Sequence, residues 1–293
     1  QARHGLTYML PTEAALQAGQ LLTDRFGRFR WQIATTATDA NRFALRVARA
    51  VTGRPKVLVF NGCYHGTVDD TMVTLENGRT VNRPGLLGQF ADLTGSATCV
   101  EFNDLAAVEA ALATGEIAAI LTEPVMTNSC MVLPEAGFHD GLRQLSRHYG
   151  TLLIIDETHT ISSGLGGYTR VHSLSPDMFV VGKCVAGGMP TAVWGITDEI
   201  AARYETANAS RPSGHSGMGT TLSANPMQFA CLVANLSEVM TAAAYAHMEK
   251  GAERLGHGLA KSIKAHGAPW HVVRVGARVE FICAPGPLKN GTE

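Results

Sequence analysis

Four short apolar runs stand out along the chain, and polar or turn-forming residues follow each of them. The runs cover residues 57–60, 118–121, 152–155 and 178–181. Continuous apolar runs of this length, bounded by turn residues, are typical of strands that are buried on both faces. We therefore expect a mostly parallel sheet at the centre of the protein.

Between and after these runs, the pattern of apolar positions changes to a helical period. Residues 39–50 carry an apolar stripe, residues 104–115 begin with a capping aspartate, and residues 225–240 begin with Asn-Pro. These features predict three helices with defined starts. Residues 206–219 are small and polar, so we expect a mobile loop there. The alternation of strands and helices predicts an α/β fold.

Composition and charge exclude several classes of protein. Of the 293 residues, 45% are hydrophobic and 17% are charged, which suits a large buried core. The 24 basic and 25 acidic residues leave a net charge of −1, so we expect no electrostatic binding of nucleic acid. The sequence lacks the run of about 18 apolar residues that a membrane span requires, so we expect no membrane partner.

The cysteines and histidines give no support to a metal site. The six cysteines are separated by at least 31 residues, and the eleven histidines show no HExxH spacing. Residues 1–10 show no signal-peptide pattern, so we expect free thiols and a cytoplasmic location.

Lys183 directly follows the last apolar run and is surrounded by glycine and alanine. We expect this position to desolvate the lysine partly, which favours the neutral amine, and a neutral amine is a Schiff-base nucleophile. The alternative is a surface lysine in a glycine-rich turn. A phosphate-binding P-loop is excluded, because the GxxxxGK[ST] spacing is absent.

Asp156 ends the 152–155 run. A carboxylate buried at a strand end needs a cationic partner or several hydrogen-bond donors. A protonated pyridine nitrogen would be such a partner. The alternative is an aspartate that caps a helix or holds a loop.

Two further segments carry candidate ligand contacts. Residues 35–41 (TTATDAN) open the 39–50 helix, where hydroxyls and free backbone N–H groups form an anion site suited to phosphate. An ordinary helix cap is the alternative. Residues 64–66 (YHG) follow the first run and could place an aromatic ring over a flat heterocycle, although core packing would also explain the tyrosine.

Six segments in order resemble the class III aminotransferases, which depend on pyridoxal phosphate and have fold type I. They are TTATDAN, NGCYHGT, TEPVMTN, LLIIDETHT, VVGKCVAGGMP and GTTLSANP. Within that family the chain is most similar to the branch of glutamate-1-semialdehyde aminomutase and amine or β-amino-acid transaminases. The resemblance starts at HGLTYMLPTE and extends to the end of the chain.

The resemblance implies a fold and an assembly. It implies a mostly parallel seven-stranded sheet flanked by helices, in a large cofactor-binding domain of residues 1–240. Residues 241–293 would begin a smaller α+β C-terminal domain. It also implies a homodimer in which each subunit contributes to the partner's active site.

The resemblance also implies a role for each matching residue. Lys183 would form the Schiff base and shuttle the proton, and Asp156 would pair with the pyridinium nitrogen. The remaining residues would bind the cofactor. Thr36, Ala37 and Thr38 would bind its phosphate, and Thr221 would reach the phosphate in the neighbouring subunit. Tyr64, with His65 beside it, and Thr158 would cover the two faces of the ring, and Glu123 would lie near the ring hydroxyl or support its neighbours.

The chain departs from the family pattern at two places. Residues 161–163 are Ile-Ser-Ser where the family commonly has Gly-Phe-Arg, and Ala37 replaces the usual glycine. The first departure would remove a residue that binds a substrate acid group or one that forms a flap.

The implied activity is an aminotransferase that moves an amino group from an amine or amino acid to a keto acid or aldehyde by a ping-pong mechanism. The alternative is an aminomutase or a racemase, which would need no external acceptor. A non-catalytic relative is a third hypothesis, against which the intact lysine and aspartate argue.

Overall fold

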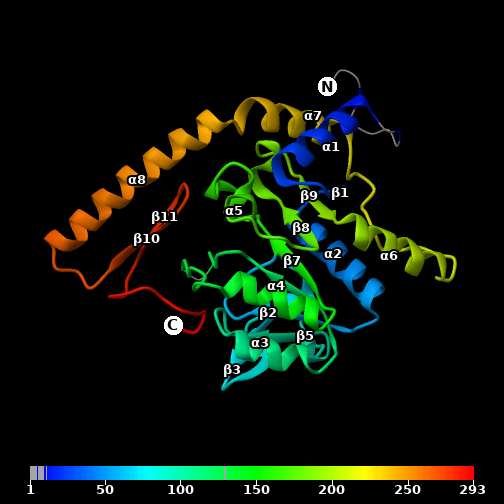
Figure 1. Cartoon of the computed structure of the whole chain (residues 1–293), viewed down its shortest axis with the longest axis horizontal. Coiled ribbons are helices and arrows are strands. Elements are labelled where there is room, and N and C mark those ends of the chain that lie inside the picture. Colours follow the sequence, from blue (N-terminus) through cyan, green and yellow to red (C-terminus); the bar gives the residue numbers. More distant parts are fainter. Residues whose placement is uncertain (1–4, 6–9, 11, 129) are drawn as a thin grey trace.

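A seven-stranded sheet forms the centre of the computed structural model, which describes residues 5, 10, 12–128 and 130–293 (Figure 1). The HGLTYMLPTE segment therefore lies mostly outside the described residues. The strand order is β1-β9-β8-β7-β6-β2-β5, and β9 runs antiparallel to both of its neighbours while the other pairs are parallel. The strands are β1 Arg30–Ala34, β2 Lys56–Phe60, β5 Ala97–Val100, β6 Ile117–Thr122, β7 Leu152–Asp156, β8 Met178–Val181 and β9 Ala192–Ile196.

The four apolar runs are strands, as predicted. They form β2, β6, β7 and β8, and every residue of the last three is buried. The expected mostly parallel, seven-stranded α/β sheet is thereby confirmed. β1 has only one buried residue because it lies at the sheet edge, which explains why its polar sequence gave no strand signal.

Helices cover both faces of the sheet, so alternate strand residues enter different cores (Figure 1). On one face, α2 and α6 pack against the sheet and form one core with it. On the opposite face, α3 and α4 pack on one half of the sheet. The other half of that face is covered by α1 and α7. The helices are α1 Glu13–Phe26, α2 Ala37–Thr52, α3 Leu105–Leu112, α4 Phe138–His148, α5 Gly167–Val171, α6 Asp198–Ala209, α7 Pro226–Ala234 and α8 Ala242–Ala265.

Helix ends follow the sequence signals with two exceptions. Asp104 accepts a hydrogen bond from the third backbone N–H of α3 at 2.9 Å, and Asn225 forms a capping box with Gln228. The predicted 225–240 helix is α-helical only to Ala234, after which residues 235–239 form a π-helical turn. The loop predicted at 206–219 is partly wrong, because α6, capped by its preceding threonine, continues through residue 209.

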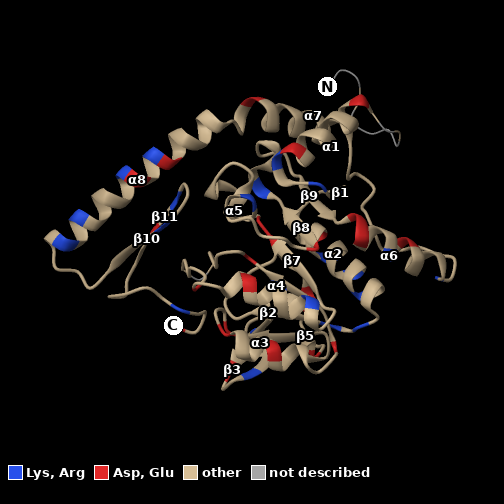
Figure 2. Ribbon diagram, viewed as in Figure 1, with Lys and Arg blue, Asp and Glu red and all other residues tan. Residues whose placement is uncertain are grey.

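The C-terminal arm, residues 242–282, extends away from the sheet (Figure 1). It consists of α8 and a hairpin of β10 His271–Val275 and β11 Arg278–Ile282. Of the 24 residues of α8, only Tyr245 and Ala252 are buried. In Figure 2, the ribbon of the same helix carries both acidic (red) and basic (blue) positions. A second hairpin, β3 Val73–Glu76 with β4 Arg79–Asn82, lies beside β5.

Within the described residues, no single helix is long and apolar enough to cross a membrane. The segments 226–239 and 242–265 meet that criterion only as a pair, which is bent by 69°.

Candidate active site

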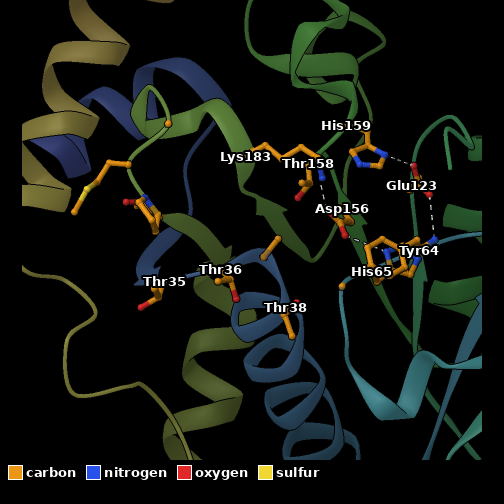
Figure 3. Close-up of a pocket in the computed structure, with 16 residues that line it drawn as sticks. Thr35, Thr36, Thr38, Tyr64, His65, Glu123, Asp156, Thr158, His159 and Lys183 are labelled. Atoms are coloured by element: carbon orange, nitrogen blue, oxygen red, sulfur yellow. Dashed lines mark hydrogen bonds and ion pairs between the residues drawn. The ribbon is translucent and has the colours of Figure 1, made fainter. Parts of the chain in front are cut away.

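A cavity of about 310 Å³ opens where β2, β6, β7 and β8 end and α2 begins. In α/β sheets, ligands bind at this carboxyl edge of the strands. Nine of the ten predicted site residues line the cavity: Thr36, Ala37, Thr38, Tyr64, His65, Glu123, Asp156, Thr158 and Lys183. Figure 3 shows the threonines of α2 at one end of the cavity and Glu123 at the other, with Asp156 between them.

The first turn of α2 provides the anion-binding end of the cavity. Thr36 is the helix cap, and its hydroxyl accepts a hydrogen bond from the Asp39 N–H at 3.2 Å. The hydroxyl of Thr38 accepts from the Thr67 N–H at 3.1 Å, which fastens the loop after β2 to the helix. In this 16-residue helix, the remaining N–H groups of the first turn and the helix dipole favour an anion.

Two glycines let neighbouring loops approach the start of α2. Gly66 has a φ of 83°, and a Cβ on it would lie 2.2 Å from the Thr38 hydroxyl oxygen. A Cβ on Gly182 would lie 2.9 Å from that of Ala37. Both distances are too short for a side chain, so glycine brings the Tyr64 loop and the Lys183 turn into direct contact with α2.

Lys183 follows β8 and begins a short 3₁₀ turn, residues 183–186. Its φ of 49° lies in the left-handed region, which is uncommon for a residue with a side chain. The expected partial desolvation is wrong for this chain, because Lys183 is exposed at the cavity rim and no described segment folds over it. Its side-chain amine makes no hydrogen bond or ion pair with any described residue, so the amine is available to a ligand.

Asp156 is only 3% exposed and receives three hydrogen bonds. One oxygen accepts from the Asn41 amide at 2.8 Å and from His65 Nδ1 at 3.0 Å, and the other from the Thr158 N–H at 3.1 Å. Burial alone would raise the pKa of Asp156, but the bonds from His65, Thr158 and Asn41 outweigh it, and the pKa is lowered. The carboxylate therefore stays ionised beside the cavity.

The neighbouring Glu157 shows the opposite balance. It is fully buried and accepts hydrogen bonds from the Thr160 hydroxyl at 2.6 Å and from the backbone N–H groups of Tyr168 and Thr169. Burial raises the pKa of Glu157 because these donors do not compensate it fully. Its contacts join the turn after β7 to α5, so it holds these two segments together rather than a ligand.

The other end of the cavity holds a second polar group, formed by Glu123, Thr127 and His159. Glu123 is 2% exposed and accepts hydrogen bonds from the Thr127 hydroxyl and, at 3.4 Å, from the Tyr64 N–H. His159 Nδ1 lies 3.5 Å from the Glu123 carboxylate (Figure 3). Glu123 thereby links the end of β6 to the loop that carries Tyr64.

Thr221, the tenth predicted residue, does not line the cavity. It is exposed in the turn before α7, where the neighbouring Thr220 hydroxyl lies 3.4 Å from that of Thr35. The turn is thus close to the start of α2 but leaves Thr221 without a role in this chain's own cavity.

Sequence reasoning missed Asn41 and His159. Asn41 is a fully buried polar residue within the apolar stripe of α2, and this mismatch could have singled it out. His159 comes three residues after Asp156, at the same strand end, which was the available signal. The reason for missing both is that sequence spacing does not say which way a side chain points.

The chain is similar to proteins of a known family. The family model for class III aminotransferases matches residues 1–282. A glutamate-1-semialdehyde 2,1-aminomutase of Roseiflexus castenholzii is 36% identical over 263 residues, which cover 88% of this chain and 59% of the relative. The chain therefore spans less than two thirds of the length of that relative.

Solved structures are similar as well. Two crystal structures of a glutamate-1-semialdehyde-aminomutase from Pseudomonas aeruginosa PAO1, one of them in complex with PMP, are 49% and 48% identical. Each superimposes with a TM-score of 0.97 over 100% of this chain and 66% of its own. An omega-transaminase from Sphaerobacter thermophilus is 27% identical, with a TM-score of 0.88 over 98% of this chain and 67% of its own.

Proposed function

Because the chain belongs to the class III aminotransferase family, we propose that it binds pyridoxal phosphate and moves an amino group within its substrate, as an aminomutase. The observation that carries the proposal is the juxtaposition of three groups in one cavity. An anion-binding helix start, the buried Asp156 carboxylate and the free Lys183 amine all border it.

The cavity fits pyridoxal phosphate group by group. The start of α2, with Thr36, Ala37 and Thr38, suits the phosphate. The Asp156 carboxylate accepts hydrogen bonds from three groups of the chain, which keep it ionised. An ionised carboxylate suits a protonated ring nitrogen. Tyr64 supplies an aromatic surface for a flat ring.

When bound, pyridoxal phosphate supplies a carbonyl group for the substrate's amine and a ring that withdraws electrons from the adjacent carbon. The chain's own residues do the rest. Lys183 Nζ, a Schiff-base nucleophile, would take and return the proton at the reacting carbon. Asp156 would keep a proton on the ring nitrogen, because its carboxylate is held ionised. Thr158 and Tyr64, which line the cavity, would border the ring, and Glu123 holds the Tyr64 loop through the Tyr64 N–H.

The names of the relatives favour one of the two reactions considered from the sequence. The Roseiflexus and Pseudomonas proteins are named as aminomutases, and the second is 49% identical. They support the aminomutase, which was the alternative, over the aminotransferase that was the main expectation. Transfer to an external keto acid or aldehyde remains a second candidate, supported by the 27% identical omega-transaminase.

The assembly that we propose is a homodimer with composite sites. Thr221 stands in an exposed turn beside the start of α2, and its hydroxyl lies outside its own cavity. If a partner subunit packed against this turn, Thr221 would lie at the phosphate-binding end of the partner's cavity. Sedimentation and cofactor release on dilution test this arrangement, because a ligand that binds only the dimer stabilises it.

A single-substrate assay tests the reaction. The purified protein is loaded with pyridoxal phosphate, checked for the visible absorbance of an imine, and given glutamate-1-semialdehyde alone. We expect formation of the isomer with the shifted amino group without a keto acid. Turnover only after a keto acid is added would replace the aminomutase with an aminotransferase, and absence of the imine absorbance would refute both.

A further inference from the structure

His159, Thr127 and Glu123 form a hydrogen-bonded chain whose direction can be assigned. The Thr127 hydroxyl has one hydrogen, which it donates to the Glu123 carboxylate. The contact of 2.5 Å between that hydroxyl and His159 Nδ1 must then be donated by the imidazole. His159 therefore carries its first proton on Nδ1, and its other ring nitrogen, Nε2, is left for a ligand.

No described residue forms a hydrogen bond with His159 Nε2. The His159 side chain is 15% exposed, borders the cavity, and makes its ring hydrogen bond through Nδ1 alone. In the neutral ring Nε2 would be an acceptor, whereas in the protonated ring it is a charged donor. The nearly buried Glu123 carboxylate, 3.5 Å away, supplies the negative charge that pairs with a protonated ring.

The described residues that line the cavity offer no other cation for a substrate. Among the described residues that line it there is no arginine, and the groups that can be positive are Lys183, His65 and His159. Lys183 is assigned to the cofactor. His65 is 2% exposed and directs its Nδ1 at Asp156.

The Ile-Ser-Ser departure at 161–163 does not provide a replacement. Ser163 is 6% exposed, and a Cβ on Gly276 of the hairpin turn would lie 2.4 Å from its Cα. The segment is thus packed against the C-terminal arm rather than at the cavity. An arginine side chain, which the family commonly places here, has no counterpart in this turn.

We propose that the imidazolium of His159 is the subsite for a substrate carboxylate, so that the enzyme takes amino acids or their aldehyde relatives rather than simple amines. The inference rests on the proposed function, because it assumes that Lys183 and Asp156 serve the cofactor. Glu123 and Thr127 hold the ring through its Nδ1, and His159 lines the cavity, so the charged Nε2–H would donate to the carboxylate.

Two unreactive ligands of nearly equal shape test the subsite: butyrate, and its uncharged amide butyramide. Their affinities for the cofactor-loaded protein are measured by titration calorimetry in the wild type and in His159→Gln. Glutamine can still donate to Thr127 but carries no charge. We expect butyrate to bind about tenfold more weakly, or worse, in the variant, which corresponds to about 1.4 kcal/mol. Butyramide affinity should not change.

Control variants distinguish a failure of the His159 subsite from a failure of the proposed function. His148→Gln, on the exposed face of α4 and outside the cavity, should leave both affinities unchanged. His159→Asn provides a second variant if the glutamine protein folds poorly. Equal butyrate affinity with and without His159, or parallel losses for butyrate and butyramide, would overturn the subsite. The imine absorbance of the same samples reports on the proposed function independently.

Discussion

The central sheet and the C-terminal arm differ most in burial. Every residue of β6, β7 and β8 is buried, whereas α8 buries two of its 24 residues. Because hydrophobic stabilisation grows with the apolar area removed from water, the sheet dominates the stability of this chain and the arm adds little. The cavity lies at the sheet, so its polar residues are held by the part that is hardest to open.

The largest difference between the two regions should appear when a lysine is removed from each. Lys183→Ala should abolish borohydride-reducible attachment of pyridoxal phosphate and all turnover, since the cavity has no second lysine among its described lining residues. Lys261→Ala, on the exposed surface of α8, should change neither. Mass spectrometry after reduction measures the attachment. A reducible link in the Lys183 variant would refute its role.

A phenylalanine in each region compares their packing. Phe179 in β8 is fully buried and its ring contacts Phe26 and Trp31, so Phe179→Ala should cost about 3–5 kcal/mol of unfolding free energy. Phe281 in β11 is 52% exposed and stacks on Trp270, and its removal should cost less, about 1 kcal/mol. Urea unfolding of the cofactor-free protein measures both. Similar losses would contradict the contrast in burial.

Acid should affect the sheet through Asp156. Its lowered folded-state pKa means that the ionised carboxylate stabilises the fold above the ordinary aspartate pKa of about 3.9. This contribution is lost as the pH falls through the folded-state value. The difference in unfolding free energy between wild type and Asp156→Asn should therefore shrink toward acid pH. Glu253→Gln, exposed on α8, serves as the control and should show a nearly constant difference.

The smallest effect is expected on the arm itself. Leu255 is 54% exposed on α8, so Leu255→Ser should alter the unfolding free energy by no more than about 0.5 kcal/mol. Thermal or urea unfolding checks it. A loss as large as that expected for Phe179 would mean that the exposed side of α8 is covered in solution.

The same contrast explains which parts of the fold could be predicted. The buried strands have continuous apolar sequences, so 118–121 and 152–155 identified β6 and β7 directly. β1 lies at the edge of the sheet and is polar, and α8 begins after a π-helical turn and a sharp bend. Neither element has a sequence pattern that fixes its place. Burial on both faces produces a clear sequence signal, and partial burial does not.

The site was predictable to the extent that strand ends determine it. Asp156 is the last residue of the buried strand β7 and Lys183 follows the buried strand β8, and the topology brings both to one edge of the sheet. The exposure of Lys183 was not predictable, because it depends on which other segments cover the rim. His159 was missed because its role depends on contacts with Thr127 and Glu123, which are more than thirty residues away in sequence.

The close approach of Gly66 and Gly182 to α2 has a consequence for redesign. With no room for a Cβ at either position, the end of the cavity at the start of α2 cannot be widened or reshaped by substitution without separating the Tyr64 loop and the Lys183 turn from the helix. The opposite end, around residues 127 and 159, has no such restriction, because side chains rather than backbone form its contacts. Directed evolution of this enzyme toward new substrates should therefore accumulate its changes at that end, while the glycines stay fixed.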